Sequence, residues 1–430
     1  MLRVIKIAIT TAITSLYYFP FWFMALPTIN TKQIIAVIGL CIGGVELIKK
    51  RSAKLDRGLI DLTILAISFS LICFFSIAYN GTTDIAYVTY IISMWVWLVG
   101  AYGVCRLIKS VHGCVSFKIL SHYLILVCVL QCFLALFIEY NIEFKTWIDQ
   151  NILQDQEFLT RVKRLYGIGA MLDTAGIRFS IALLLLSFLI TRRKTDNQKG
   201  LTFLYLVAFI VLTIVGNMIA RTTSTGVILS LSYIVYCQFF RKGERPFELK
   251  ELVYGVLIII CICIPTVSYL YNIDDTFQKN FRFGFEGIFN LVETGVWKVG
   301  SNEQLKSMII FPETFKTWLI GDGYFNNPLA TDPYYIGKIT GGYYMGTDIG
   351  YLRFIFYCGL IGLSAFSLYI CKVVSLCIER YPTKREILFL LGILNFVVWF
   401  KVSTDLFLMF ALLLMADAEV PSNERPNNTH

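Results

Sequence analysis

Apolar segments long enough to cross a membrane recur from one end of this chain to the other. Hydrophobic residues make up 57% of its 430 residues, charged residues make up only 16%, and the mean hydropathy is +0.67. A soluble domain of ordinary composition does not carry so much apolar surface. Because a helix needs roughly 20 apolar residues to cross about 30 Å of hydrocarbon, the sequence predicts an all-α, polytopic integral membrane protein.

By this length criterion the chain contains about 12 transmembrane helices. We expect them at 4–26, 33–48, 59–79, 85–105, 121–140, 173–190, 201–219, 225–240, 252–271, 349–371, 386–400 and 405–416. The polar segment 272–347 separates the ninth span from the tenth, and we expect a large, partly helical external loop there. Since no strong internal repeat divides the chain, we expect a single membrane domain over 1–416 and a short tail, 417–430.

Basic residues in the short loops predict the orientation, since Lys and Arg near the ends of spans stay in the cytoplasm. Four clusters fall on the same side of the twelve-span arrangement: Lys49, Lys50, Arg51, Lys54 and Arg57; Arg192, Arg193, Lys194 and Lys199; Arg241, Lys242, Arg245 and Lys250; and Lys372, Arg380, Lys384 and Arg385. Both termini are then cytoplasmic, and the loops 141–172 and 272–347 face outward. This topology explains most of the net charge of +9, so nucleic acid is not an expected partner.

Three arginines lie close to the outer ends of predicted spans. Arg178 is just inside the sixth span, Arg221 is at the tip of a short outward hairpin, and Arg353 is about one turn into the tenth span. An Arg near mid-bilayer costs about 2.5–3.5 kcal/mol on insertion scales. A guanidinium binds phosphate or carboxylate oxygens in pairs, so three of them near one face predict a shared anionic target. For each arginine alone, snorkelling or pairing with a neighbouring acid explains its position equally well.

The long polar segment holds one arginine, Arg282, among more numerous acids. On a continuous helix Arg282 and Glu286 would be i, i+4 neighbours and would pair with each other. The alternative is that Arg282 supplies charge to a phosphate while Glu286 or Glu293 handles a proton. Aromatic residues crowd the second half of the segment and the span after it: Trp318, Tyr324, Phe325, Tyr334, Tyr335, Tyr343, Tyr344 and Tyr351. We expect them either at the membrane interface or on a surface that packs against sugar rings.

Metal and disulfide chemistry is not expected on the outward side. All 12 cysteines fall in predicted spans or cytoplasmic loops. The three histidines are His112 and His122, both predicted to be cytoplasmic, and the terminal His430. The sequence therefore predicts neither a disulfide framework nor a metal site there, and no cofactor is expected.

The residues around Arg221 and Arg353 belong to two longer segments with a recognisable pattern. These segments are IARTTSTGVILSLSYIVY at 219–236 and TDIGYLRFIFYCGLIGLSAF at 347–366, and RLYGIGAMLDTAGIRFSIAL and TWLIGDGYF accompany them. The first resembles the Ser/Thr-Arg-Thr-Gly type turn of bacterial O-antigen polymerases and ligases. The second resembles the Asp-x-Gly-Tyr span that follows the large periplasmic loop of the polymerases. The resemblance runs in order from about residue 160 to 365, and the first five spans match only in being hydrophobic.

This resemblance implies a metal-independent glycosyltransferase of the bacterial inner membrane with its active site facing the periplasm. Such a polymerase transfers a glycan from undecaprenyl pyrophosphate onto a lipid-linked repeat unit of O-antigen or a similar surface polysaccharide. The residues then expected to bind the substrate and its pyrophosphate are Arg164, Arg178, Arg221, Arg282, Arg353, Tyr324 and Tyr351. The expected base, which accepts the proton of the attacking hydroxyl, is Glu293 or Asp348. The implied partners are the undecaprenyl-pyrophosphate-linked oligosaccharide, membrane lipid and a polysaccharide chain-length regulator.

Other functions fit the pattern less well. An O-antigen ligase is expected to use a histidine in its large periplasmic loop, and no histidine of this chain is predicted to reach the outward face. A lipid-linked oligosaccharide flippase or another transporter usually has two similar halves and binding charges at mid-membrane. A peptidoglycan polymerase of the shape, elongation, division and sporulation type shares the large external loop, but its motifs are not found. A protein O-mannosyltransferase carries an acidic pair in its first external loop, which here is only PTINTK.

Overall fold

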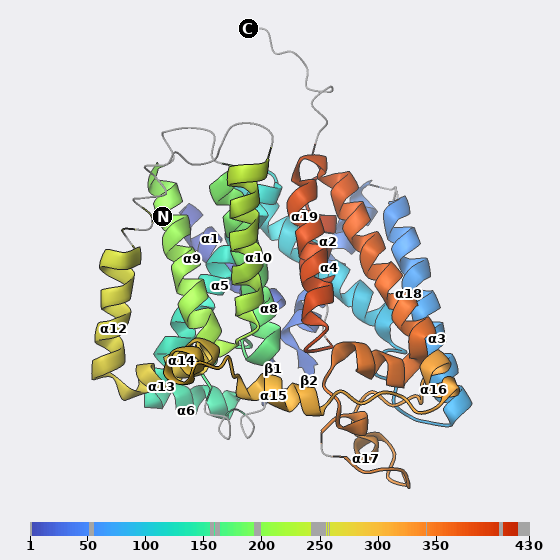
Figure 1. The fold of residues 1–430 in the computed structure, drawn as a ribbon. Coiled ribbons are helices and arrows are strands. Elements are labelled where there is room, and N and C mark those ends of the chain that lie inside the picture. The colour runs from blue at the N-terminus through green and yellow to red at the C-terminus, as the bar shows by residue number, and fades with distance from the viewer. Residues whose placement is uncertain are drawn as a thin grey trace. The chain divides into compact units, whose positions relative to one another are not determined.

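Helices dominate the computed structural model (Figure 1), which describes residues 2–50, 56–154, 159, 164–192, 199–241, 255, 257, 259–340, 342–403 and 407–419. Within these residues, eight helices are long and apolar enough to cross a membrane. They are α2 (Thr31–Lys50), α3 (Arg57–Asn80), α4 (Tyr90–His112), α5 (Phe117–Tyr140), α8 (Leu172–Thr191), α9 (Lys199–Ile219), α10 (Thr223–Val235) with its π-helical extension η2 (Tyr236–Phe240), and α18 (Gly350–Arg380). The predicted helical membrane protein is confirmed at this level, and the count of about 12 spans stays a prediction.

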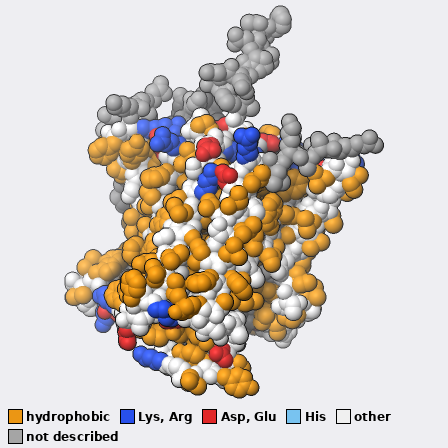
Figure 2. Space-filling view, turned by 90° about the vertical axis from the view of Figure 1, so that its right-hand side faces the viewer, with side chains coloured by type: hydrophobic (Ala, Val, Ile, Leu, Met, Phe, Trp, Pro, Cys, Tyr) orange, Lys and Arg blue, Asp and Glu red, His pale blue; other side chains and the backbone are white. Residues whose placement is uncertain are grey.

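Figure 2 shows how side chains are distributed on one face of the molecule. Hydrophobic side chains cover its middle band, and charged side chains gather toward the two ends. Many of the exposed apolar residues belong to the long helices, for example Leu71 and Phe74 of α3 and Leu368 of α18. In water such a surface would be strongly unfavourable, and in a bilayer it faces hydrocarbon.

The other four predicted spans are shorter helices or lie partly outside the described residues. Three of these spans match a shorter helix: 4–26 matches α1 (Leu2–Tyr18), 386–400 matches α19 (Arg385–Val398), and 405–416 matches α20 (Phe407–Met415). The described part of 252–271 forms the π-helix η3 (Ile259–Cys263) and the start of α12 (Ile264–Ile273), and the rest lies outside the described residues. The prediction for 4–26 is wrong in its second half, because Pro20 restricts Phe19 to extended conformations and the helix ends before it.

The chain after α1 forms part of a small sheet, which the all-α prediction did not include. β1 (Trp22–Phe23) lies between β2 (Leu26–Asn30) and β3 (Ile152–Leu153) and is antiparallel to both. Just beyond β1, the backbone N–H of Met24 donates to the Asn151 carbonyl at 2.8 Å. The sheet thus ties the segment after α1 to the end of α6 (Ile142–Asn151).

The polar segment 272–347 is partly helical and contains several short helices and turns. They are α13 (Asp275–Gly284), α14 (Glu286–Thr294), α15 (Gly300–Ser307), α16 (Phe315–Ile320), α17 (Pro328–Thr331) and the 3-10 turn η4 (Tyr344–Gly346), and a second short turn, η5 (Pro382–Lys384), precedes α19. The placement of 272–347 outside the membrane stays a prediction.

The chain divides into two compact units, and the expected single membrane domain stays a prediction. Unit 1 comprises 1–18, 31–120 and 303–430, and unit 2 comprises 19–30 and 121–302. In unit 1, α2 packs on α4, α3 on α18, and α20 on α4. In unit 2, α8 packs against both α9 and α10. Arg164, Arg178, Arg221, Arg282 and Glu293 belong to unit 2, and Tyr324, Asp348, Tyr351 and Arg353 belong to unit 1.

Aromatic side chains form much of the core of unit 1. Phe366 of α18 stacks on Trp399 with ring centroids 5.5 Å apart, and it also contacts Phe69 of α3 at 4.7 Å and Phe354 at 5.1 Å. Aromatic pairs contribute about 0.5–1.5 kcal/mol each beyond the area they bury. This cluster links α3, both halves of α18 and the chain that follows α19.

The helices of unit 2 come very close together around the α9–α10 turn. A Cβ on Gly226 of α10 would lie only 2.3 Å from Cα of Ser180 of α8. The Ser180 hydroxyl donates to the Thr222 carbonyl at 3.2 Å. Because α8 and α9 run in opposite directions, Arg192 at the end of α8 and Lys199 at the start of α9 lie at one end of the pair, and the turn lies at the other.

α18 is interrupted at Gly359, where its backbone leaves the helical region and the helix changes direction (Figure 1). Gly359 has φ 67° and ψ −173°, a conformation that is almost exclusive to glycine. The loop after α16 packs into this break, with the Asp322 N–H donating to the Phe356 carbonyl at 2.6 Å. The short first half of α18, which carries Arg353, is thereby set apart from the long second half.

Gly359→Ala is expected to destabilise the protein by about 2–6 kcal/mol, the sum of backbone strain and overpacking. A Cβ at this position would lie 2.1 Å from the Leu319 carbonyl oxygen. Thermal unfolding of the purified protein in detergent measures the effect. Gly44→Ala is the matched control, because a Cβ on Gly44 of α2 meets nothing within 4 Å and Ala favours the helix. Equal melting temperatures for the two variants would contradict the close packing of α16 on α18.

Candidate anion-binding site

Arg221 occupies the turn between α9 and α10 in unit 2, and α13 and α14 cover it. Its Nε donates to the Phe283 carbonyl at 2.9 Å, and its Nη1 donates to the Ser301 hydroxyl at 3.2 Å. The same Nη1 lies 2.6 Å from Oε2 of Glu286 in an ion pair. Its side chain is only 17% exposed. The guanidinium of Arg221, at the tip of the hairpin, is therefore half-buried and held by several contacts, so it does not snorkel.

A second guanidinium shares the surroundings of Arg221. The guanidinium carbon of Arg221 lies 4.0 Å from the centroid of the Phe283 ring, and that of Arg164 lies 4.8 Å from it. Both cations thus contact one aromatic ring from chain segments that are far apart in sequence. The Nε of Arg164 is buried and has no hydrogen-bond partner among the described residues. We call Arg164, Arg221, Phe283 and Glu286 the arginine cluster.

The electrostatics of the arginine cluster favour an anionic ligand. Burial lowers the pKa of the Arg221 guanidinium, Glu286 raises it, and the positive charge of Arg164 lowers it further. Burial also lowers the pKa of Arg164, and the carboxylate of Asp173 opposes this effect. Both side chains stay protonated at neutral pH, because the ordinary pKa of Arg lies above 12. Two partly desolvated cations side by side are stabilised when an anion with several oxygens binds both.

Polar contacts within the turn hold Arg221 in place. The Thr222 hydroxyl donates to the Asp173 carboxylate of α8. The Thr223 hydroxyl donates to the Gly216 carbonyl at 3.0 Å, and the Ser224 hydroxyl donates to the Asn217 side chain at 2.6 Å. These hydroxyl protons are already used within the protein, so their main role is to fix the turn.

The acids and bases of α13 and α14 do not pair as a continuous helix would predict. Glu286 contacts Arg221, and Arg282 instead binds both carboxylate oxygens of Glu293, at 2.8 and 2.9 Å. The predicted i, i+4 pair of Arg282 and Glu286 is wrong because the helix breaks at Phe285, between α13 and α14. Arg282 also donates to the Tyr271 hydroxyl at 3.0 Å, and these groups raise its pKa. Both side chains of the Arg282–Glu293 pair are close to half exposed.

Arg178 lies in unit 2 but contacts a different element. Its guanidinium carbon is 5.1 Å from the centroid of the Phe19 ring. On α8, Asp173, Gly176 and Ser180 face the α9–α10 turn and α10. Arg178 follows Gly176 by two positions, which is about 200° around the helix, so it points to the opposite side from this face.

Arg353 belongs to unit 1 and is almost completely enclosed. Its guanidinium carbon lies 3.9 Å from the Phe325 ring centroid and 3.6 Å from that of Tyr343. Its Nη1 donates to the Ser403 hydroxyl at 2.7 Å and lies 3.6 Å from Asp348. The side chain is 7% exposed. These contacts give Arg353 a packing role between the polar segment and the short first half of α18, and Asp348 is its neighbouring acid.

The two tyrosines expected to bind substrate make contacts within unit 1. Tyr351 donates to the Phe396 carbonyl at 2.6 Å and packs against Trp399. Tyr324 donates to Asp332 at 3.0 Å, and burial together with this carboxylate raises the pKa of Tyr324 to about 12. Tyr324 also packs against Tyr344, which donates to Asp322 at 3.2 Å. Tyr324 and Tyr344 thus use their hydroxyl protons within the protein, whereas the side chain of Tyr334 is 89% exposed.

The sequence did not single out three residues that contact the candidate site or the polar segment. Phe283 and Asp173 carry no local signal, because their roles depend on contacts with distant segments. Asp84 is buried and holds the polar segment of unit 1: its carboxylate accepts the N–H groups of Phe325 and Asn326, both at 2.9 Å. The only sign of this role in the sequence was the position of Asp84 in the loop 80–84, which follows the third predicted span.

Neither metal ligands nor known relatives add to this picture. Among the described residues, no group of three or more His, Cys, Asp or Glu is arranged to hold a metal ion. No protein-family model, no curated protein and no solved structure matches the chain.

Proposed function

We propose that this protein is a polysaccharide polymerase that transfers an undecaprenyl-pyrophosphate-linked glycan onto a lipid-linked repeat unit of O-antigen or a similar surface polysaccharide. The observation that carries the proposal is the pair of half-buried guanidinium groups of Arg164 and Arg221 on the Phe283 ring. A pyrophosphate offers several anionic oxygens to such a pair. The motif resemblance and the long apolar helices agree with this function, and we place the reaction at the periplasmic face of the bacterial inner membrane.

In the proposed reaction the bond between the anomeric carbon of the donor glycan and the pyrophosphate oxygen breaks. A new bond forms between that carbon and a hydroxyl oxygen of the acceptor sugar. The polyprenyl pyrophosphate leaves with the electron pair of the broken bond, and Arg164 and Arg221 stabilise the negative charge that develops on it. The hydroxyl proton passes to a carboxylate.

Glu286, which was expected from the sequence beside Glu293 as a residue that could handle a proton, fits the role of this carboxylate better than Glu293 or Asp348. It already contacts Arg221, and its other oxygen accepts the Gly300 N–H at 3.3 Å. Glu293 is bound on both oxygens by Arg282, and Asp348 lies in unit 1 beside Arg353. A pyrophosphate competes with Glu286 for Arg221, so binding of the donor releases this carboxylate to accept a proton next to the leaving group.

Deletion of the gene tests the proposed function. Without the polymerase, surface glycolipid on a silver-stained gel is expected to show core carrying a single repeat unit, with the longer ladder lost. Re-expression of the intact chain restores the ladder. Bare core with lipid-linked polymer would indicate a ligase, and bare core with unpolymerised units trapped inside the cell would indicate a flippase. Either pattern, or an unchanged ladder, contradicts the proposal for this polysaccharide.

A further inference from the structure

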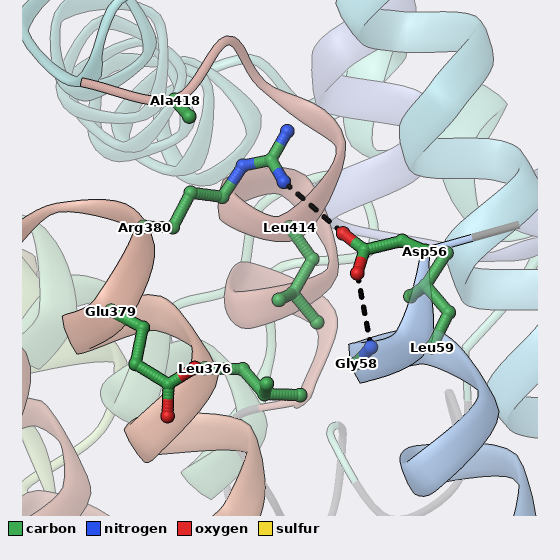
Figure 3. A pocket seen from close by; sticks show the side chains of 8 residues that line it. All are labelled: Asp56, Gly58, Leu59, Leu376, Glu379, Arg380, Leu414 and Ala418. Atoms are coloured by element: carbon green, nitrogen blue, oxygen red, sulfur yellow. Dashed lines mark hydrogen bonds and ion pairs between the residues drawn. The ribbon is translucent and has the colours of Figure 1, made fainter. Parts of the chain in front are cut away.

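A separate pocket lies in unit 1, at the end of the helices where α3 begins and α18 and α20 end (Figure 3). Its volume is about 260 Å³, and it is lined by Asp56, Gly58, Leu59, Leu376, Glu379, Arg380, Leu414 and Ala418. Ligand sites for drug-sized molecules enclose about 300–1,000 Å³. This pocket therefore suits a small chemical group. None of its lining residues has a role in the proposed polymerase reaction.

Charges of both signs meet at the rim of the pocket. In Figure 3, Arg380 and Asp56 reach toward each other from α18 and α3, and Leu414 and Leu376 lie beneath them. The Nη1 of Arg380 is 3.6 Å from Asp56, a longer separation than in a tight ion pair. The Nε and Nη2 of Arg380 donate to the Ala416 carbonyl at 3.1 and 2.7 Å, which fixes the guanidinium and directs Nη1 toward the pocket.

The lining matches a head group that carries an ammonium and a phosphate. Two carboxylates, of Asp56 and Glu379, and one guanidinium, of Arg380, give the rim a net charge of −1. This balance disfavours a purely anionic ligand. A primary ammonium donates hydrogen bonds that a carboxylate of the rim accepts, and a phosphodiester accepts hydrogen bonds from Nη1 of Arg380.

The apolar wall and the position of the pocket point to a lipid. Leu59, Leu376 and Leu414 line the pocket beside its charged groups. The pocket lies where α3 begins and α18 ends, which is the level of the head groups for helices that cross a bilayer. We propose that this pocket binds the head group of an aminophospholipid, phosphatidylethanolamine, as a structural lipid of unit 1.

Binding of defined lipids to the purified full-length protein tests this proposal, with native mass spectrometry as the readout. Phosphatidylethanolamine is compared with phosphatidylcholine and phosphatidylglycerol that carry the same acyl chains. Phosphatidylethanolamine is expected to bind about tenfold more tightly than either, since trimethylation removes the ammonium donors and phosphatidylglycerol lacks the cation. Equal affinities, or a preference for phosphatidylglycerol, would overturn the proposal without the need for any variant.

A double variant, Asp56→Asn with Glu379→Gln, locates the binding site. In the wild type the Gly58 N–H donates to Oδ1 of Asp56 at 2.9 Å. Asn caps a helix as well as Asp does, so this hydrogen bond is expected to be retained in the variant. Likewise, the amide oxygen that Glu379→Gln introduces still accepts from the Ser375 hydroxyl. The double variant is expected to lose the preference for phosphatidylethanolamine. Asp61→Asn is the control, because this carboxylate also lies on α3 but pairs with Lys372 outside the pocket. An unchanged preference in the double variant places the lipid elsewhere and refutes the proposed site.

Discussion

Arg221→Ala is expected to abolish glycan polymerisation while the protein still accumulates in the membrane. Loss of an arginine that stabilises a phosphoryl leaving group, or of an oxyanion donor, lowers catalytic rates by about 10²–10⁵-fold. Arg164 remains after this change, but a lone guanidinium on the Phe283 ring no longer holds the leaving group from two sides. The length distribution of surface glycans on a gel measures the effect, and an immunoblot of the membrane fraction measures the protein.

Two further variants show whether any loss at Arg221 comes from the lost charge or from misfolding. Arg221→Lys keeps the charge but loses the planar fork, so it is expected to give short chains at reduced yield. Lys306→Ala is the control, because this side chain is 70% exposed and pairs with Glu303 three residues earlier. It is expected to leave the ladder unchanged. Normal chains from Arg221→Ala at a wild-type protein level would refute the role of Arg221 in binding the pyrophosphate.

An exchange of the two charges separates a structural ion pair from a functional one. In the double variant Arg221→Glu with Glu286→Arg, opposite charges still meet and the fold is expected to be restored relative to either single variant. Polymerisation is nevertheless expected to remain lost, because the negative charge then lies where the phosphate binds. Recovery of activity in the exchanged pair would mean that Arg221 and Glu286 serve only to hold α13 and α14 on the turn.

The long helices could be predicted from the sequence because length and hydropathy alone decide them. α3, α4, α5 and α8 all fall close to their predicted spans. Local exceptions were harder to see. Pro20 ends α1 early, and Gly359 interrupts α18 inside what looks like one apolar span. In both cases the backbone preference of one residue overrides the hydropathy of its surroundings.

The candidate site was predictable in its charges but not in its contacts. Arg221 was singled out because it is a cation at the tip of a short hairpin between two apolar spans, although snorkelling explained this position of the single residue equally well. Its partner Glu286 was assigned to Arg282, since a helix break at Phe285 leaves no clear mark in the sequence. Arg353 gave the same signal as Arg221, yet it is enclosed by Phe325 and Tyr343. Only tertiary packing distinguishes an accessible cation from an enclosed one.

Glu286→Gln is expected to lower kcat by about 10²–10⁴-fold, the usual contribution of a general base. Gln is nearly isosteric and keeps an acceptor for Arg221 and for the Gly300 N–H, so the turn and α14 are expected to stay in place. KM for the lipid-linked donor is expected to fall, since a neutral amide at position 286 competes with the pyrophosphate for Arg221 less strongly than the carboxylate does. Kinetics with purified enzyme and a defined lipid-linked substrate measure both constants.

A comparison of Glu286→Gln with Glu293→Gln shows which carboxylate acts as the base. Glu293→Gln is the matched control, because Glu293 lies on the same helix and binds Arg282 instead. Its kcat is expected to stay close to that of the wild type. If Glu293→Gln lowers kcat by about 10²–10⁴-fold and Glu286→Gln does not, the base is Glu293, and Glu286 only occupies the phosphate position in the empty enzyme.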